Sequence, residues 1–169
     1  MYGGFRHRCH DRDTDRADLR CDETDFLSEL PGQIRPINWY FDKLLLESFA
    51  QMGDGLTVYE GLTRKFEFIQ KERVFFAGAF RSDDHNSLRE HDYELILDFY
   101  TQLIRRKTGR QPEENILFPL RLYCRGSIDM TVEWIFAPKE KTPEQMAALL
   151  VSAFPAPVTE LFQQLGVLR

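Results

Sequence analysis

Apolar residues recur along most of the chain at the three- and four-residue spacing that buries one face of a helix. The first such segment is residues 37–52, in which charged residues occupy the side opposite the apolar ones. Its apolar positions are Ile37, Phe41, Leu44, Leu45 and Phe49. The Gly-Asp-Gly sequence at 53–55 follows and predicts the end of this helix.

The same spacing continues downstream of this helix. It predicts helices over residues 57–80, 87–106, 111–136, 142–154 and 159–165. Asn86 or Ser87 is the expected N-cap of the third helix, and Thr142, followed by proline, is that of the fifth. Lys65 is expected on the solvent side of the second helix. Because no segment alternates as a strand does, we expect an all-α fold, an antiparallel bundle of about five to six helices.

The helix expected over 111–136 is apolar around most of its circumference, which is typical of a helix enclosed by partners. Its charges fall four residues apart, in one stripe that includes a possible Arg125–Asp129 pair. Gly126 lies in the middle of this helix, where glycine costs about 1 kcal/mol relative to alanine. We therefore expect another helix or a ligand to approach closely at Gly126.

Composition narrows the class of protein. The 169 residues are 43% hydrophobic and carry a net charge of −5, which indicates a globular domain without a strongly basic nucleic-acid footprint. No stretch approaches the roughly 20 apolar residues of a membrane span, and the N-terminus lacks a signal peptide's apolar core. We expect a cytoplasmic protein. Three cysteines argue against a disulfide framework.

The best candidates for a ligand site are aromatic and polar residues placed between the helices, as in small-molecule pockets. They are Phe66, Tyr100, Tyr123, Arg125, Met130 and Trp134. The competing interpretation is that these aromatic residues are ordinary core and that the stripe containing Arg125 is a solvated or dimer-interface face.

The sequence gives little support for a metal site. The spacing of His7, Cys9, His10 and Cys21 matches no familiar zinc pattern, so no metal or cofactor is expected. The polar segment 82–87, with His91 and Asp92, is typical of a capping loop with exposed charges.

Nor does the sequence indicate an enzyme. Ser127 lacks the context of a nucleophile, and Cys124 is expected in the core. No acid–base or nucleophile constellation stands out in the rest of the chain.

Four stretches together carry a family resemblance: NWYFDKLLLESF, RVFFAGAFRSDDHNSLREHDYELILDFY, LRLYCRGSIDMTVEWIF and KTPEQMAALLVSAFP. In this order they resemble the C-terminal domain of TetR-family transcriptional regulators, in its Firmicutes-type branch, which includes dihydroxyacetone-kinase regulator-like members. The resemblance implies an all-helical domain over 37–169 that binds a small effector or partner and forms a homodimer. The pairing helices would be residues 112–136 and 143–154.

Residues 1–36 depart from that family. Its members carry a helix-turn-helix domain ahead of this region, whereas these residues hold 6 Arg, no Lys and 8 acidic residues without helical spacing. Shifted by one nucleotide, codons for residues 10–36 are compatible with MTVTPIARICGVTRQTFYRNFRDKYDL, which resembles a TetR-type helix-turn-helix. We therefore expect 1–36 to be a non-native, disordered segment left by a frameshift.

Three functional hypotheses follow. The first is a ligand-sensing and dimerisation domain without a working DNA-binding head. DNA would then be a partner only of an intact relative. If the reading frame is repaired, the gene product would itself be an intact DNA-binding repressor. The second is a free-standing helical adaptor module. An enzyme is the weakest alternative.

Overall fold

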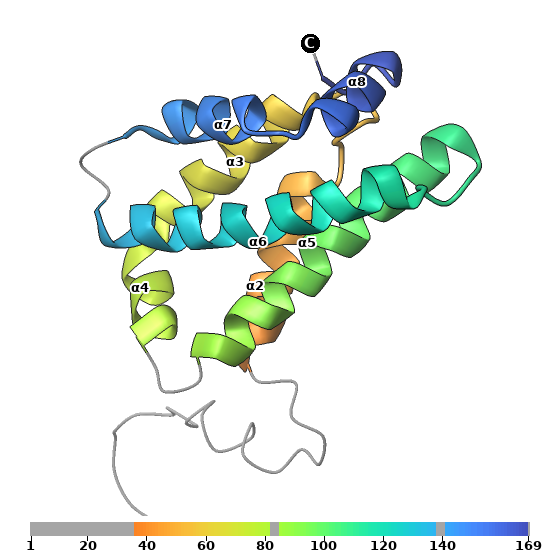
Figure 1. Ribbon diagram of the computed structural model, residues 1–169. Coiled ribbons are helices and arrows are strands. Elements are labelled where there is room, and N and C mark those ends of the chain that lie inside the picture. The colour runs from red at the N-terminus through yellow and green to blue at the C-terminus, as the bar shows by residue number, and fades with distance from the viewer. Residues whose placement is uncertain (1–35, 82–84, 138–140, 169) are drawn as a thin grey trace, which may run out of the picture. The chain divides into compact units, whose positions relative to one another are not determined.

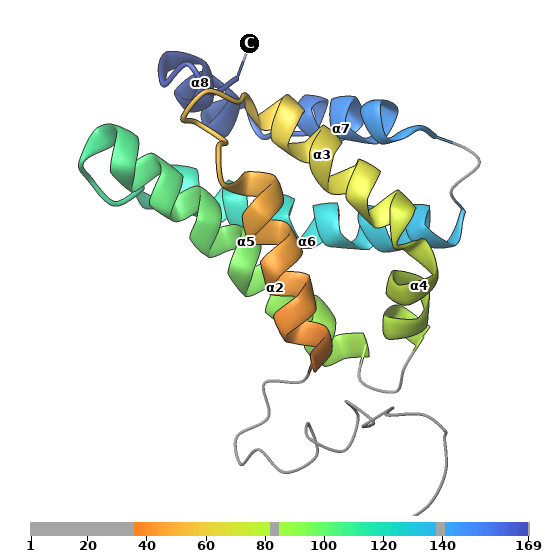
Figure 2. The same ribbon diagram turned by 180° about the vertical axis from the view of Figure 1, so that it is seen from behind.

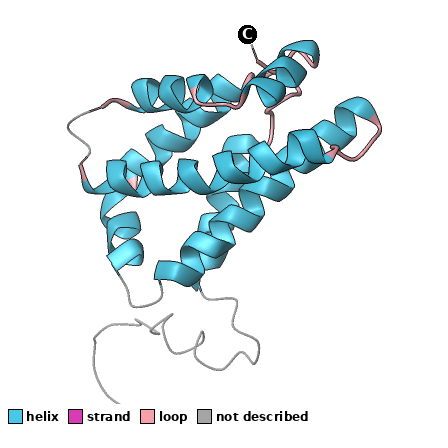
Figure 3. Cartoon of the chain, viewed as in Figure 1, coloured by secondary structure: helices cyan, strands magenta, loops and turns pink. Residues whose placement is uncertain are grey.

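The computed structural model describes residues 36–81, 85–137 and 141–168, which belong to one compact unit spanning 34–169. These residues form seven helices and no strand, so the all-α prediction is confirmed, with more helices than expected (Figure 3). They are α2 (Pro36–Phe49), α3 (Val58–Lys71), α4 (Arg73–Arg81), α5 (His85–Thr108), α6 (Glu114–Phe136), α7 (Pro143–Ser152) and α8 (Ala156–Gln164).

Helix ends follow the capping chemistry of the sequence. Thr57 and Thr142 each begin a capping box, in which the threonine hydroxyl accepts from the third helical N–H and the side chain of Glu60 or Gln145 accepts from the threonine N–H. Gly53 follows α2 with a φ of 85°, a conformation that favours glycine. The predicted N-cap at Thr142 is confirmed, and α2 ends at Phe49, three residues before the predicted end.

The helix predicted over 57–80 is in fact two helices, because Glu72 separates α3 from α4. The break contains neither glycine nor proline. Tertiary contacts explain it: α3 packs against α2 and α7, whereas α4 packs against α5 and α6. The Arg73 Nε donates to the Ile135 carbonyl of α6 at 2.7 Å and fixes the start of α4 against that helix.

The helices enclose one apolar core to which all seven contribute. In both ribbon views α3 runs alongside α7, and α6 crosses α5 (Figures 1 and 2). α2 contacts α3 and α5. The fully buried side chains Phe66, Tyr100, Leu120 and Phe162 hold these layers together, since bulky apolar groups contribute most to burial.

The predictions for residues 1–36 and for the N-cap of the third helix fall outside the described residues or at their edge. The proposed frameshifted segment, apart from Pro36, lies outside them. The third helix begins at His85 and therefore already includes Asn86 and Ser87, so neither residue is its N-cap as predicted.

Among the described helices, no single one is long and apolar enough to cross a membrane. α7 and α8 together meet the length and composition criteria, but a bend of 104° separates them.

Candidate functional site

Two of the six predicted ligand-site residues, Tyr100 and Tyr123, meet in an aromatic cluster at the centre of the core. Their ring centroids are 6.4 Å apart, and Tyr123 stacks on Phe154 at 4.1 Å. The Tyr123 hydroxyl donates to the Leu150 carbonyl at 3.0 Å. Burial raises the pKa of both tyrosines, so both stay protonated and act as packing groups with a polar end.

Phe66 and Trp134 form a second aromatic contact, between α3 and α6. Their rings meet edge to face with centroids 5.3 Å apart, and both are buried. The Trp134 Nε1 donates to the Lys141 carbonyl at 2.9 Å, which connects α6 to the start of α7. Trp134 also lines a groove on the surface, described below.

Arg125 and Met130, the other two predicted site residues, lie on the outside of α6. The Arg125 guanidinium makes two hydrogen bonds to Glu90 on α5, at 3.0 and 3.2 Å, and lies 3.8 Å from the Tyr93 ring centroid. The six residues are thus distributed over two core clusters and the outer face of α6. Their role in binding a ligand stays a prediction.

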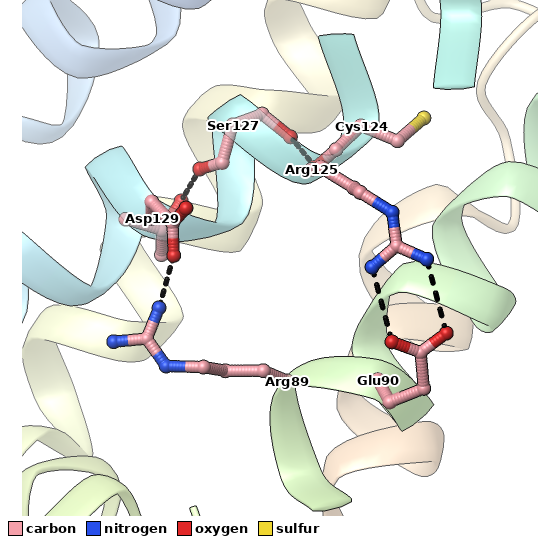
Figure 4. A network of polar contacts seen from close by, with 7 residues as sticks. Arg89, Glu90, Cys124, Arg125, Ser127 and Asp129 are labelled. Carbon is pink, nitrogen blue, oxygen red and sulfur yellow. Dashed lines mark hydrogen bonds and ion pairs between the residues drawn. The ribbon is translucent and has the colours of Figure 1, made fainter. Parts of the chain in front are cut away.

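A pair of ion bridges joins α5 to α6 (Figure 4). Arg89 of α5 contacts Asp129 of α6, and Arg125 of α6 contacts Glu90 of α5. The hydrogen bonds from Arg125 lower the pKa of the Glu90 carboxyl. The predicted Arg125–Asp129 pair within α6 is therefore wrong, because each residue finds an oppositely charged side chain on the neighbouring helix.

Within α6, buried hydroxyls are satisfied locally. Ser127 donates to the Cys124 carbonyl at 2.8 Å, and Thr131 donates to the Ser127 carbonyl at 2.7 Å. Cys124 is fully buried, as predicted, and burial raises the pKa of its thiol to about 12. A thiol with such a pKa stays protonated at neutral pH, which makes it a packing residue.

The outer face of α6 is unusually apolar for a surface. Phe118, Leu122 and Met130 are 58%, 61% and 45% exposed, and they follow one another at multiples of four residues along the helix. Gly126 completes this row, and a Cβ placed on it would meet nothing within 4 Å. No helix of the described chain therefore makes the close approach that the sequence predicts at Gly126.

This row continues into a groove between α6 and α7 with a volume of about 360 Å³. Leu149 of α7, half exposed, belongs to the same surface. We call Phe118, Leu122, Gly126, Met130 and Leu149 together the α6–α7 face. The groove is lined by Met130, Glu133, Trp134, Ala137, Lys141, Met146, Leu149, Leu150 and Ala153.

Two charged residues that the sequence placed on the surface are buried. Lys65 of α3 was expected on the solvent side and is 5% exposed, and Asp92 of α5 was expected among exposed charges and is 1% exposed. Both expectations are wrong. The spacing held the signal: Asp92 lies midway between Leu88 and Ile96 in the buried stripe of α5, four residues from each.

Within the described ranges, no group of three or more histidine, cysteine, aspartate or glutamate side chains is placed to hold a metal ion. His7, Cys9, His10 and Cys21 lie outside those ranges.

The described residues form an all-helical domain with an apolar outer face on α6 and α7. Comparison with protein families matches residues 57–154 to the C-terminal region of TetR-type transcriptional regulators. Since the match covers more than half of the chain, the protein belongs to this family through its C-terminal region. Neither the curated proteins nor the solved structures include a match to the chain.

Proposed function

We propose that this chain is the ligand-sensing and dimerisation domain of a TetR-family regulator and forms a homodimer through residues 112–136 and 143–154. The observation that supports pairing most strongly is the α6–α7 face. Soluble monomers seldom expose a continuous row of large apolar side chains, and such a row beside a groove is typical of a protein interface.

Gly126 supports a helical partner in particular. It costs about 1 kcal/mol relative to alanine in a helix, and nothing in the described chain uses the space above it. A second copy of α6 crossing at this position would use that space, with Phe118 or Leu122 of one copy entering the other's groove. A two-fold axis would make the contacts reciprocal and close the assembly as a dimer.

Light scattering on the purified chain tests the pairing. We expect a dimer for the wild type and a monomer for Leu122→Glu, because a carboxylate at the centre of the interface would be desolvated without a partner. Val74→Glu is the matched control, since Val74 is 90% exposed on α4, outside the α6–α7 face. A monomeric wild type, or a Leu122→Glu variant that stays dimeric, contradicts the proposal.

The sensing role follows from membership in the family and from the buried polar groups between α3, α5 and α6. In an intact regulator, an effector bound between the core helices would favour one arrangement of the two subunits and so change the separation of the recognition helices. A thermal-shift screen tests sensing. A dimer that no small molecule stabilises favours the alternative of an adaptor module.

We further propose that residues 1–36 do not supply a working DNA-binding head. Their 8 acidic residues outnumber their 6 arginines, and their codons, shifted by one nucleotide, are compatible with a helix-turn-helix pattern. We expect no sequence-selective shift of promoter DNA in electrophoresis at moderate salt. Tight selective binding, or a shifted frame containing stop codons, contradicts this proposal. If the frame is repaired, the product would be an intact DNA-binding regulator.

A further inference from the structure

Lys65 and Asp92 bring opposite charges into the core without a direct bond between them. Asp92 is 1% exposed, and its Oδ1 has no hydrogen-bond partner. Lys65, 5% exposed, makes none of the ion pairs found among the described residues. A buried carboxylate oxygen without a donor is costly, so its presence in a folded core requires an explanation.

The two groups are near enough to influence each other. Burial raises the pKa of the Asp92 carboxyl, and the charge of Lys65 opposes that rise. The same two charges act on the buried thiol of Cys124. The charge of Lys65 lowers the pKa of this thiol, and the charge of Asp92 raises it. Lys65 belongs to α3, Asp92 to α5 and Cys124 to α6, so three helices contribute these buried groups.

Aromatic rings and a fourth helix border this place. The Lys65 Nζ lies 5.9 Å from the centre of the Phe49 ring, which stacks on Phe99 at 4.7 Å. His91, next to Asp92, contacts Asp42 of α2 through its Nε2 at 2.5 Å. The surroundings thus combine apolar rings with one unpartnered acceptor and one buried ammonium group.

We propose that Lys65 and Asp92 are the polar ends of a binding site for a small neutral ligand that carries a hydroxyl or primary amide group. Such a group donates one hydrogen bond to the Asp92 Oδ1 and accepts another from the Lys65 Nζ. The carbon part of the ligand lies against the rings of Phe49 and Phe99. The proposal names the effector chemistry of the sensing role proposed above and rests on that role.

Charge balance selects a neutral ligand. A neutral ligand leaves the charge balance between Lys65 and Asp92 as it is, whereas an added carboxylate or amine would bring a further charge into the core. Burial selects a small one, because both side chains are almost entirely enclosed by protein. The chemistry of a hydroxyl or amide also matches the pair in a way that a purely apolar ligand does not, since only a group that both donates and accepts satisfies both ends.

The test is a titration monitored by the backbone amide NMR spectrum. Its four probes each have three carbons: 1-propanol, propionamide, propionate and 1-propylamine. We expect saturable shifts around Lys65 and Asp92 with at least one of the two neutral probes, and none with the two ions. Lys65→Met approximates the length of the lysine side chain, Asp92→Leu keeps the branched shape of the aspartate side chain, and each should weaken binding at least tenfold. Glu94→Gln, an exposed position on the same helix, should bind as the wild type does.

Three results overturn the proposal: no saturable shift with either neutral probe, equal binding of the charged probes, or unchanged binding in both core variants. Circular dichroism verifies that each variant is folded. If a single variant is unfolded, the double variant Lys65→Met/Asp92→Leu replaces it in the titration. Light scattering on the same samples separates the two proposals. A monomer that binds the probe contradicts only the pairing, whereas a dimer without binding contradicts only this site.

Discussion

Arg125 of α6 holds Glu90 of α5 through two hydrogen bonds, at 3.0 and 3.2 Å, while Arg89 of α5 reaches back to Asp129 of α6. The two helices therefore exchange charges in both directions (Figure 4). This exchange fixes the rotation of α6 about its axis relative to α5, because side chains four residues apart on α6 are both engaged. That rotation turns Phe118, Leu122 and Gly126 outward.

Replacing Glu90 by glutamine should lower the melting temperature at neutral pH by a small amount, since both members of the pair are exposed. The hydrogen bonds from Arg125 hold the pKa of Glu90 below its ordinary value of 4.5. The stabilisation is therefore present above that value and lost as pH falls through the lowered pKa. The difference between variant and wild type should shrink as thermal unfolding is repeated from pH 6 toward and below 4.5. Glu94→Gln is the control, and an identical pH dependence there would contradict the assignment.

Tyr123→Phe should destabilise the domain by about 1 kcal/mol, the usual net contribution of one intramolecular hydrogen bond. The change removes the hydroxyl that donates to the Leu150 carbonyl but preserves the stack with Phe154. Urea unfolding measures the effect, with Tyr59→Phe on the exposed side of α3 as the control. Equal losses in the two variants would show that the bond to Leu150 contributes nothing specific.

Gly126→Ala should have opposite effects on the fold and on the dimer. A Cβ at this position meets nothing within 4 Å, so each chain gains about 1 kcal/mol of helix propensity. In the proposed dimer the added methyl group keeps the partner helix at a greater distance, and the dissociation constant rises. Sedimentation measures the association, and chemical unfolding of the dissociated chain measures the fold.

Gly78→Ala on α4 is the matched control for Gly126→Ala, because its Cβ would also meet no atom within 4 Å. It should give the same gain in helix stability and leave the dissociation constant unchanged. If Gly126→Ala also leaves association unchanged, the partner helix does not cross at that position.

Replacing Lys65 and Asp92 together should cost less stability than replacing either one. Removing a single member leaves the other charge buried without compensation, at a cost of about 3–5 kcal/mol, whereas exchanging a buried charged pair for apolar residues is often neutral or stabilising by about 1–4 kcal/mol. Urea unfolding of Lys65→Met, Asp92→Leu and the double variant completes the cycle. Additive losses in the double variant would show that the two charges do not interact.

The candidate site was predictable only in part, for a reason that α5 illustrates. Leu88, Ile96 and Tyr100 follow the helical spacing of a buried stripe, and all three are buried. Asp92 lies on the same stripe, yet its charge led to the prediction of an exposed position. When periodicity and polarity disagree at one residue, the sequence gives no rule for choosing, and such conflicts are expected at functional or strained positions.

By itself the sequence determined the helical class of this protein, the threonine cap that begins α7, and the family resemblance. The helical class and the cap are local properties, because each depends on residues within a turn or two of one another. Only the tertiary structure decided the break at Glu72 and the burial of Lys65. It also decided that the ion-pair partner of Arg125 is Glu90 and not Asp129. Each of these depends on which helix lies opposite, and periodicity along one chain reports which face is buried but not what that face meets.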